Sequence, residues 1–123
     1  IKGKLNTIKA GQDVKIGEFK IETMRTTHSI ADSICLAIDT PAGVIFHTGD
    51  FKIDYTPVDG EPINFQKWAD LGHRGVLLML ADSTNAERKG YTASERTIGV
   101  TLENIFRGST ARILIATFSS NVH

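Results

Sequence analysis

The segment ICLAIDTPAGVIFHTGD, residues 34–50, is the clearest structural signal in this chain. Ile34, Leu36 and Ile38 alternate with smaller residues, which is the period-two pattern of a half-buried strand. Residues 40–43 predict a turn, and residues 44–47 predict the return strand of a hairpin. A glycine then precedes the final aspartate, so we expect the backbone to turn sharply and to present a carboxylate beyond the strand.

Further elements are predicted on both sides of this hairpin. Upstream, residues 13–17 and 19–22 alternate with period two and predict two more strands. Downstream, Asn64 is expected to cap a short helix that ends at Gly72. The residues expected to face inward from this helix are Phe65, Trp68 and Leu71. The apolar run 76–81 predicts a strand buried on both faces.

The last third of the chain continues this alternation of helix and strand. Residues 92–95, TASE, predict a capping box in which Glu95 reaches back to Thr92. The helix that follows is expected to end at Gly108 and to bury Ile98, Leu102, Ile105 and Phe106. Residues 112–118 predict another buried strand. Because hairpins come first and helices then alternate with strands, we expect an α/β layered fold with a domain junction near residues 90–92.

Composition limits the class of protein without naming a function. The chain has 123 residues, with Lys plus Arg and Asp plus Glu both at 14, so net charge predicts neither nucleic-acid nor membrane binding. A local basic groove for RNA is not excluded. No apolar run approaches the roughly 20 residues that span a bilayer. The single cysteine, Cys35, lies in an apolar run, which favours a buried thiol and a reducing, cytoplasmic location. The missing initiator methionine and the abrupt ending lead us to expect a fragment of a longer protein.

Polar residues follow several predicted strands, and these are the candidate site residues. His28 and Asp50 each lie where an apolar alternation stops, and α/β proteins bind ligands beyond such strand ends. Imidazole and carboxylate together commonly hold a divalent metal, and the two oxygens of Asp50 suit it to bridging two cations. On local grounds alone, a structural histidine and an aspartate that caps the loop remain open alternatives.

Two other strand ends carry candidates. Asp82 closes a predicted buried strand, where an unpaired carboxylate is costly, so a histidine supplied from elsewhere would suit it as a partner. Ser119, Ser120 and Asn121 offer hydroxyl, amide and backbone donors at the end of the last strand. Such donors suit a phosphate and a helix cap equally well.

Five segments together resemble the ribonuclease J family in order and spacing: THSIADS at 27–33, HTGDFK at 47–52, TPVDG at 56–60, DSTNAE at 82–87 and ATFSSNVH at 116–123. That family belongs to the metallo-β-lactamase superfamily and carries a β-CASP insertion. The resemblance implies part of a metallo-β-lactamase αββα sandwich over residues 1–91. It implies the beginning of a β-CASP α/β domain over residues 92–123.

The resemblance also implies an activity. Members of the family are metal-dependent ribonucleases of bacterial RNA processing and decay. They act as 5′→3′ exonucleases that favour RNA with a 5′-monophosphate, and as endonucleases. The expected partners are therefore RNA and a second copy or a paralogue of the parent, with no membrane. The expected cofactor is two zinc ions for each parent site, with manganese as the alternative.

Roles follow from the resemblance residue by residue. His28 matches a residue that binds one zinc ion, and Asp50 matches the residue that bridges two. Asp82 matches the first β-CASP signature residue, expected to pair with a catalytic histidine further along the chain. Residues 119–121 match a stretch near the RNA backbone. The His-x-His-x-Asp-His motif of the family would lie before residue 1 and its later histidines beyond residue 123, so we expect this chain alone to be inactive.

Two other functions remain open. A non-catalytic paralogue, acting as an RNA-binding or scaffold subunit, would keep the fold while the histidines outside this segment were substituted. A metallo-hydrolase acting on a small ester or thioester would share the metal site but would not need the DSTN segment at 82–85.

Overall fold

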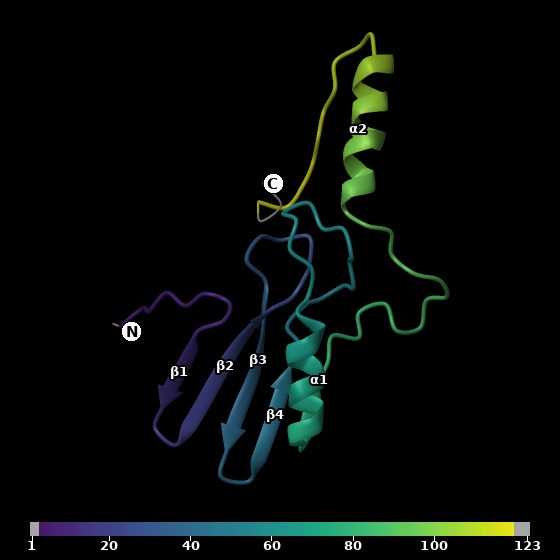
Figure 1. The fold of residues 1–123 in the computed structure, drawn as a ribbon. Coiled ribbons are helices and arrows are strands. Elements are labelled where there is room, and N and C mark those ends of the chain that lie inside the picture. The colour runs from purple at the N-terminus through teal and green to yellow at the C-terminus, as the bar shows by residue number, and fades with distance from the viewer. Residues whose placement is uncertain (1–2, 120–123) are drawn as a thin grey trace.

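The computed structural model describes residues 3–119, and its main feature is a five-stranded sheet with one helix packed against it (Figure 1). The strands lie in the order β1-β2-β3-β4-β5. The pairs β1–β2, β2–β3 and β3–β4 are antiparallel, whereas the pair β4–β5 is parallel. The mixed α/β class that the sequence predicts is confirmed. The elements are β1 (Asp13–Ile16), β2 (Phe19–Arg25), β3 (Ile34–Thr40), β4 (Gly43–His47), α1 (Phe65–Arg74), β5 (Leu78–Leu80) and α2 (Arg96–Gly108).

The hairpin predicted from residues 34–50 is formed by β3 and β4, with Thr40 paired to Gly43 at the turn. The alternation along β3 is also confirmed, but the fully buried face carries the small side chains Cys35 and Ala37. The other face, with the larger aliphatic residues, is only half-buried. Small side chains under α1 leave room for larger ones from the helix and from β4, which explains this choice of face.

The core lies between α1 and the sheet and consists of Met24, Cys35, Ala37, Phe46 and Leu71. Trp68 packs against this cluster, with its ring centroid 5.3 Å from that of Phe46 in an edge-to-face arrangement. Burial raises the pKa of the Cys35 thiol. The prediction of a buried core thiol is therefore confirmed.

Helix α1 begins as predicted, because the Asn64 side chain accepts a hydrogen bond from the backbone N–H of Lys67 at 3.1 Å. Its predicted end at Gly72 is wrong, since the helix continues to Arg74 and stops before Gly75, which has φ +90°. Arg74 forms ion pairs with Glu22 on β2 and Asp39 on β3, and these contacts hold the last turn against the sheet. Leu71 faces inward as expected, whereas Phe65 is 36% exposed.

The predicted burial of three later segments is wrong for the described residues. Strand β5 spans three residues, and each of them is between 46% and 55% exposed. The expected buried face of α2 is exposed, and residues 112–118 form no strand within the described range. A strand needs a neighbour for its hydrogen bonds, and an apolar stripe is buried only where another layer covers it. Within residues 3–119, β5 pairs only with β4, residues 112–118 pair with no strand, and α2 stands apart from the sheet (Figure 1).

The predicted capping box at the start of α2 is also wrong. Glu95 itself occupies the N-cap position, with helical backbone angles and no side-chain cap hydrogen bond. Its carboxylate lies 2.5 Å from the Nζ atom of Lys52 instead. Between residues 3 and 119, neither helix is long and apolar enough to cross a membrane.

Candidate functional site

The topology of the sheet brings the ends of β2, β4 and β5 to the same edge. Strands β2 and β4 are both antiparallel to β3, and β5 is parallel to β4, so the carboxyl ends of all three coincide. His28 follows β2, Asp50 follows β4 and Asp82 follows β5. Ligand sites of α/β proteins lie beyond such strand ends.

His28 and Asp50 converge in this region, with 3.9 Å between His28 Nε2 and Asp50 Oδ2. The Asp50 side chain is 81% exposed and that of His28 is 31% exposed, so both are open to a ligand. Two atoms bound to one zinc ion at about 2.0–2.2 Å each lie no more than about 4.3 Å apart, and the observed separation fits that limit. Within the described residues, no group of three or more histidine, cysteine, aspartate or glutamate side chains is placed to hold a metal.

The backbone at Gly49 sets the position of Asp50. Gly49 has φ +61°, and a Cβ atom there would lie 2.6 Å from the carbonyl oxygen of Ile34. The preceding residue, Thr48, is fully buried, and its hydroxyl donates to the Gly49 carbonyl and accepts from the Asp82 N–H. Thr48 thus joins the end of β4 to the residue that follows β5. This role was not anticipated from the sequence, because a threonine at a strand end has no distinctive local pattern.

The partners of Asp82 come from its own turn and from the Asp50 loop. One carboxylate oxygen accepts hydrogen bonds from the hydroxyl and the N–H of Thr84, and the other accepts from the Phe51 N–H at 3.4 Å. The Thr84 hydroxyl, then these N–H groups and finally nearby His28, hold the pKa of Asp82 below its usual value. Asp82 is therefore an ionised acceptor, and a partner histidine from elsewhere stays a prediction.

One open cleft, with a volume of about 660 Å³, is lined by His28, Asp50 and Asp82. The segment before α2 also lines this cleft, through Tyr91, Thr92 and Glu95. The three residues that the sequence singled out for a metal or for catalysis thus share one space, although they lie far apart along the chain.

The predicted phosphate-binding stretch is only partly described. Ser119 is exposed and follows Phe118, which lines a second cavity together with His28 and Asp50. Ser120 and Asn121 lie outside the described residues. The role of this stretch near RNA therefore stays a prediction.

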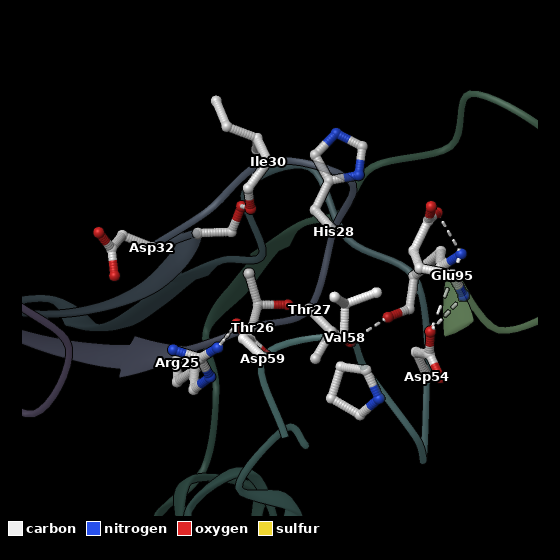
Figure 2. Close-up of a pocket in the computed structure, with 13 residues that line it drawn as sticks. Arg25, Thr26, Thr27, His28, Ile30, Asp32, Asp54, Val58, Asp59 and Glu95 are labelled. Atoms are coloured by element: carbon white, nitrogen blue, oxygen red, sulfur yellow. Dashed lines mark hydrogen bonds and ion pairs between the residues drawn. The ribbon is translucent and has the colours of Figure 1, made fainter. Parts of the chain in front are cut away.

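A second group of charged residues beside His28 was not anticipated from the sequence (Figure 2). Asp54 is 4% exposed and accepts hydrogen bonds from the N–H groups of Thr56 and Glu95. Burial alone would raise the pKa of Asp54, but these N–H groups, the Ser94 hydroxyl and the Lys52 charge outweigh it and lower the pKa. No local sequence pattern predicts this group, because it joins two segments that lie about 40 residues apart.

Replacing Asp54 with asparagine is expected to lower the thermal unfolding midpoint at neutral pH. Each carboxylate oxygen of Asp54 accepts one backbone N–H, and an amide has only one oxygen to accept with. A carboxyl with a lowered pKa stabilises the fold above its usual pKa of 3.8, and this contribution is lost as the pH falls through the lower folded value. The wild type should therefore lose more stability than D54N as the pH is lowered from neutral to below 3.8. Equal pH dependence in both, with exposed D70N as control, would contradict the assignment.

Comparison with known proteins adds the family. The chain is 50% identical over 120 residues to ribonuclease J of Synechocystis sp., a match that covers 97% of this chain and 19% of that protein. It is 50% identical over 110 residues to ribonuclease J of Helicobacter pylori strain 26695, covering 89% of this chain and 16% of that protein. Ribonuclease J of Thermus thermophilus is 43% identical over 120 residues, covering 97% of this chain and 21% of that protein.

A solved structure resembles the fold. A protein of unknown function from Enterococcus faecalis V583 superimposes with a TM-score of 0.63 at 16% identity, covering 85% of this chain and 25% of that chain. This likeness supports the α/β arrangement alone. No family profile matches the sequence. The identities to ribonuclease J extend over nearly the whole chain, whereas the chain spans about a fifth of the length of those curated relatives. By sequence, this chain therefore matches one segment of ribonuclease J proteins over nearly its whole length.

Proposed function

We propose that this chain is part of a metal-dependent ribonuclease of the ribonuclease J type, which hydrolyses RNA phosphodiester bonds. One observation carries the proposal. The sheet brings His28, Asp50 and Asp82 into one cleft, in a chain that is half identical to ribonuclease J proteins. The longer protein of the experiments below is the full reading frame that contains this chain.

The exposed imidazole and carboxylate are the groups that would hold the cations. His28 Nε2 is the proposed ligand of one metal ion, and Asp50, with two free oxygens, is the proposed bridge between two. Both zinc and manganese accept this donor set. A bound pair of such ions supplies a hydroxide nucleophile at neutral pH and stabilises charge on the reacting phosphate.

Asp82 and the end of the chain have supporting roles in this proposal. The Asp82 carboxylate, which accepts hydrogen bonds from Thr84 and Phe51, is proposed to accept another from a histidine and so to orient it. Ser119, Ser120 and Asn121 are proposed to contact the RNA backbone. The proposed substrate is RNA with a 5′-monophosphate, cleaved in the 5′→3′ direction and also internally.

The proposal extends to the domains and to assembly. Residues 1–91 would belong to a metallo-β-lactamase-type domain and residues 92–123 would begin a β-CASP domain. The exposed apolar residues of α2 and β5 are consistent with further layers in the longer protein. A homo-oligomer, or a pair with a paralogue, is the proposed assembly.

The test is RNA cleavage by the purified longer protein. A 5′-monophosphorylated RNA labelled at its 3′ end should be degraded, and a chelator should abolish cleavage until zinc or manganese is restored. This chain alone should not cleave the same RNA, because two ligands hold divalent cations weakly. Activity that survives complete chelation, or cleavage by this chain alone, would contradict the proposal.

The rival function is a non-catalytic paralogue that binds RNA or acts as a scaffold. It predicts that the longer protein binds the labelled RNA with substituted histidines upstream and without cleavage at any metal concentration. The retained His28 and Asp50 favour the enzyme, since a scaffold has no need to keep two converging ligands.

A further inference from the structure

Lys52 lies where three segments of the chain meet. Its backbone N–H donates to the carbonyl of Thr27 at 2.8 Å, and the Thr27 hydroxyl donates to the Lys52 carbonyl. Thr27 immediately precedes His28, and Lys52 follows Asp50 by two residues. The Lys52 side chain leaves this loop and contacts the segment before α2, with Nζ 3.0 Å from the Ala93 carbonyl.

Other contacts join the same two segments. The Lys52 Nζ atom lies 2.5 Å from Glu95 Oε1, and the Glu95 N–H donates to Asp54 Oδ2 at 2.9 Å. The Thr56 hydroxyl donates to Ser94 Oγ, which donates in turn to the Thr56 carbonyl at 2.8 Å. We call this set the latch: Lys52, Asp54, Thr56, Ala93, Ser94 and Glu95. Figure 2 shows two of its members, Asp54 and Glu95, close together beside His28.

The charges of the latch are mostly buried. The side chains of Lys52, Asp54 and Glu95 are 15%, 2% and 22% exposed, and the one ammonium group lies 2.5 Å from the Glu95 carboxylate and 4.0 Å from that of Asp54. Removing one member of a partly buried ion pair leaves the other charge with less compensation, which costs more than losing a fully exposed pair. The latch therefore joins residues 52–56 to residues 93–95 by contacts that are costly to remove.

The latch connects two segments that line the cleft. One carries His28 and Asp50, the other carries Tyr91, Thr92 and Glu95, and we call these two segments the walls of the cleft. We propose that Lys52 is a positioning residue that fixes the segment before α2 against the loop of Asp50, so that RNA held between the walls meets Asp50 in a reactive alignment. This inference rests on the proposed ribonuclease function and goes beyond it.

The test is Lys52→Met in the longer protein. Misplacement of a substrate by about 1 Å costs up to about 100-fold in rate, so kcat should fall by about 10- to 100-fold. KM should stay within about threefold, because most contacts to RNA remain. Lys52→Arg keeps the charge and should restore kcat to within about threefold of wild type. Lys67→Met changes an exposed lysine of α1, is the matched control and should behave as wild type.

A double-mutant cycle separates the latch from a general loss of charge. Glu95→Gln weakens the ion pair but keeps the Glu95 backbone N–H bonded to Asp54. It should therefore lower kcat less than Lys52→Met does. It should also remain folded even if Lys52→Met fails to fold. The double variant should be no worse than Lys52→Met alone. The inference is overturned if Glu95→Gln and a folded Lys52→Met both have wild-type kcat. It is also overturned if the two substitutions lower kcat additively in the double variant, or if they change KM without changing kcat.

A second readout does not depend on nuclease activity. Arg88 and Lys89 lie on the exposed segment between β5 and α2 and are sites for trypsin. Cleavage there should be faster in Lys52→Met than in wild type, Lys52→Arg or Lys67→Met. A longer protein that never cleaves RNA overturns the proposed function, whereas equal trypsin cleavage in all four proteins overturns the latch whether or not the enzyme is active.

Discussion

Asp50→Ala in the longer protein should lower RNA cleavage by more than about 1,000-fold. The carboxylate is the proposed bridge between two cations, and losing several kcal/mol of transition-state stabilisation corresponds to this factor. The fold should be retained, since the side chain is 81% exposed and its one ion-pair contact among the described residues is with His28. The measurement is the single-turnover rate on labelled RNA, together with the metal content of each protein.

The matched control is Asp70→Ala, which removes an exposed carboxylate from α1. This variant should retain wild-type turnover, metal content and unfolding midpoint. Near-wild-type turnover of Asp50→Ala would contradict the bridging role. If Asp50→Ala is unfolded under the assay conditions, its loss of activity would instead show that Asp50 is needed for folding.

Gly49→Ala should destabilise the protein strongly and also impair cleavage. Alanine at φ +61° costs about 1–2 kcal/mol, and its Cβ would lie 2.6 Å from the Ile34 carbonyl oxygen, which is backbone and cannot swing away. Relief of this clash must move β3 or the loop, and the loop carries Asp50. We therefore expect a loss of more than about 2 kcal/mol in unfolding free energy and a lower kcat.

Gly17→Ala isolates the clash from the backbone strain. Gly17 has nearly the same angle, φ +58°, but a Cβ there meets nothing within 4 Å. Its alanine variant should show only the cost of the left-handed backbone and leave kcat unchanged. Thermal or urea unfolding of both variants measures the difference. Equal destabilisation by the two substitutions would show that contact with Ile34 does not matter.

Local patterns predicted much of the sheet and the convergence of the candidate site residues. Alternation identified β1 to β3, the turn signal at residues 40–43 identified β4, and the polar residues after β2, β4 and β5 do meet at one edge. This part was predictable because a strand direction fixes where the next polar residue emerges, and antiparallel pairing alternates those directions.

Burial and long-range pairing could not be predicted in the same way. Glu95 fits a capping box by spacing, but the cation that it contacts lies on a loop 43 residues earlier. Likewise, the apolar stripe of α2 shows which face is suited to burial, without showing which segment covers it. Helix α1 passed Gly72 because contacts of Arg74 with two strands outweigh a local stop signal.

The sheet separates two ends of the molecule. Proposed chemistry gathers at one edge, whereas the hairpin turns at residues 17–18 and 41–42 lie at the other edge and are exposed (Figure 1). Surface turns tolerate change better than the strands that they connect. A fluorophore or an affinity tag inserted at either turn would thus lie on the side of the protein remote from the proposed site. Amino-acid changes at these turns should likewise leave the proposed site unaffected.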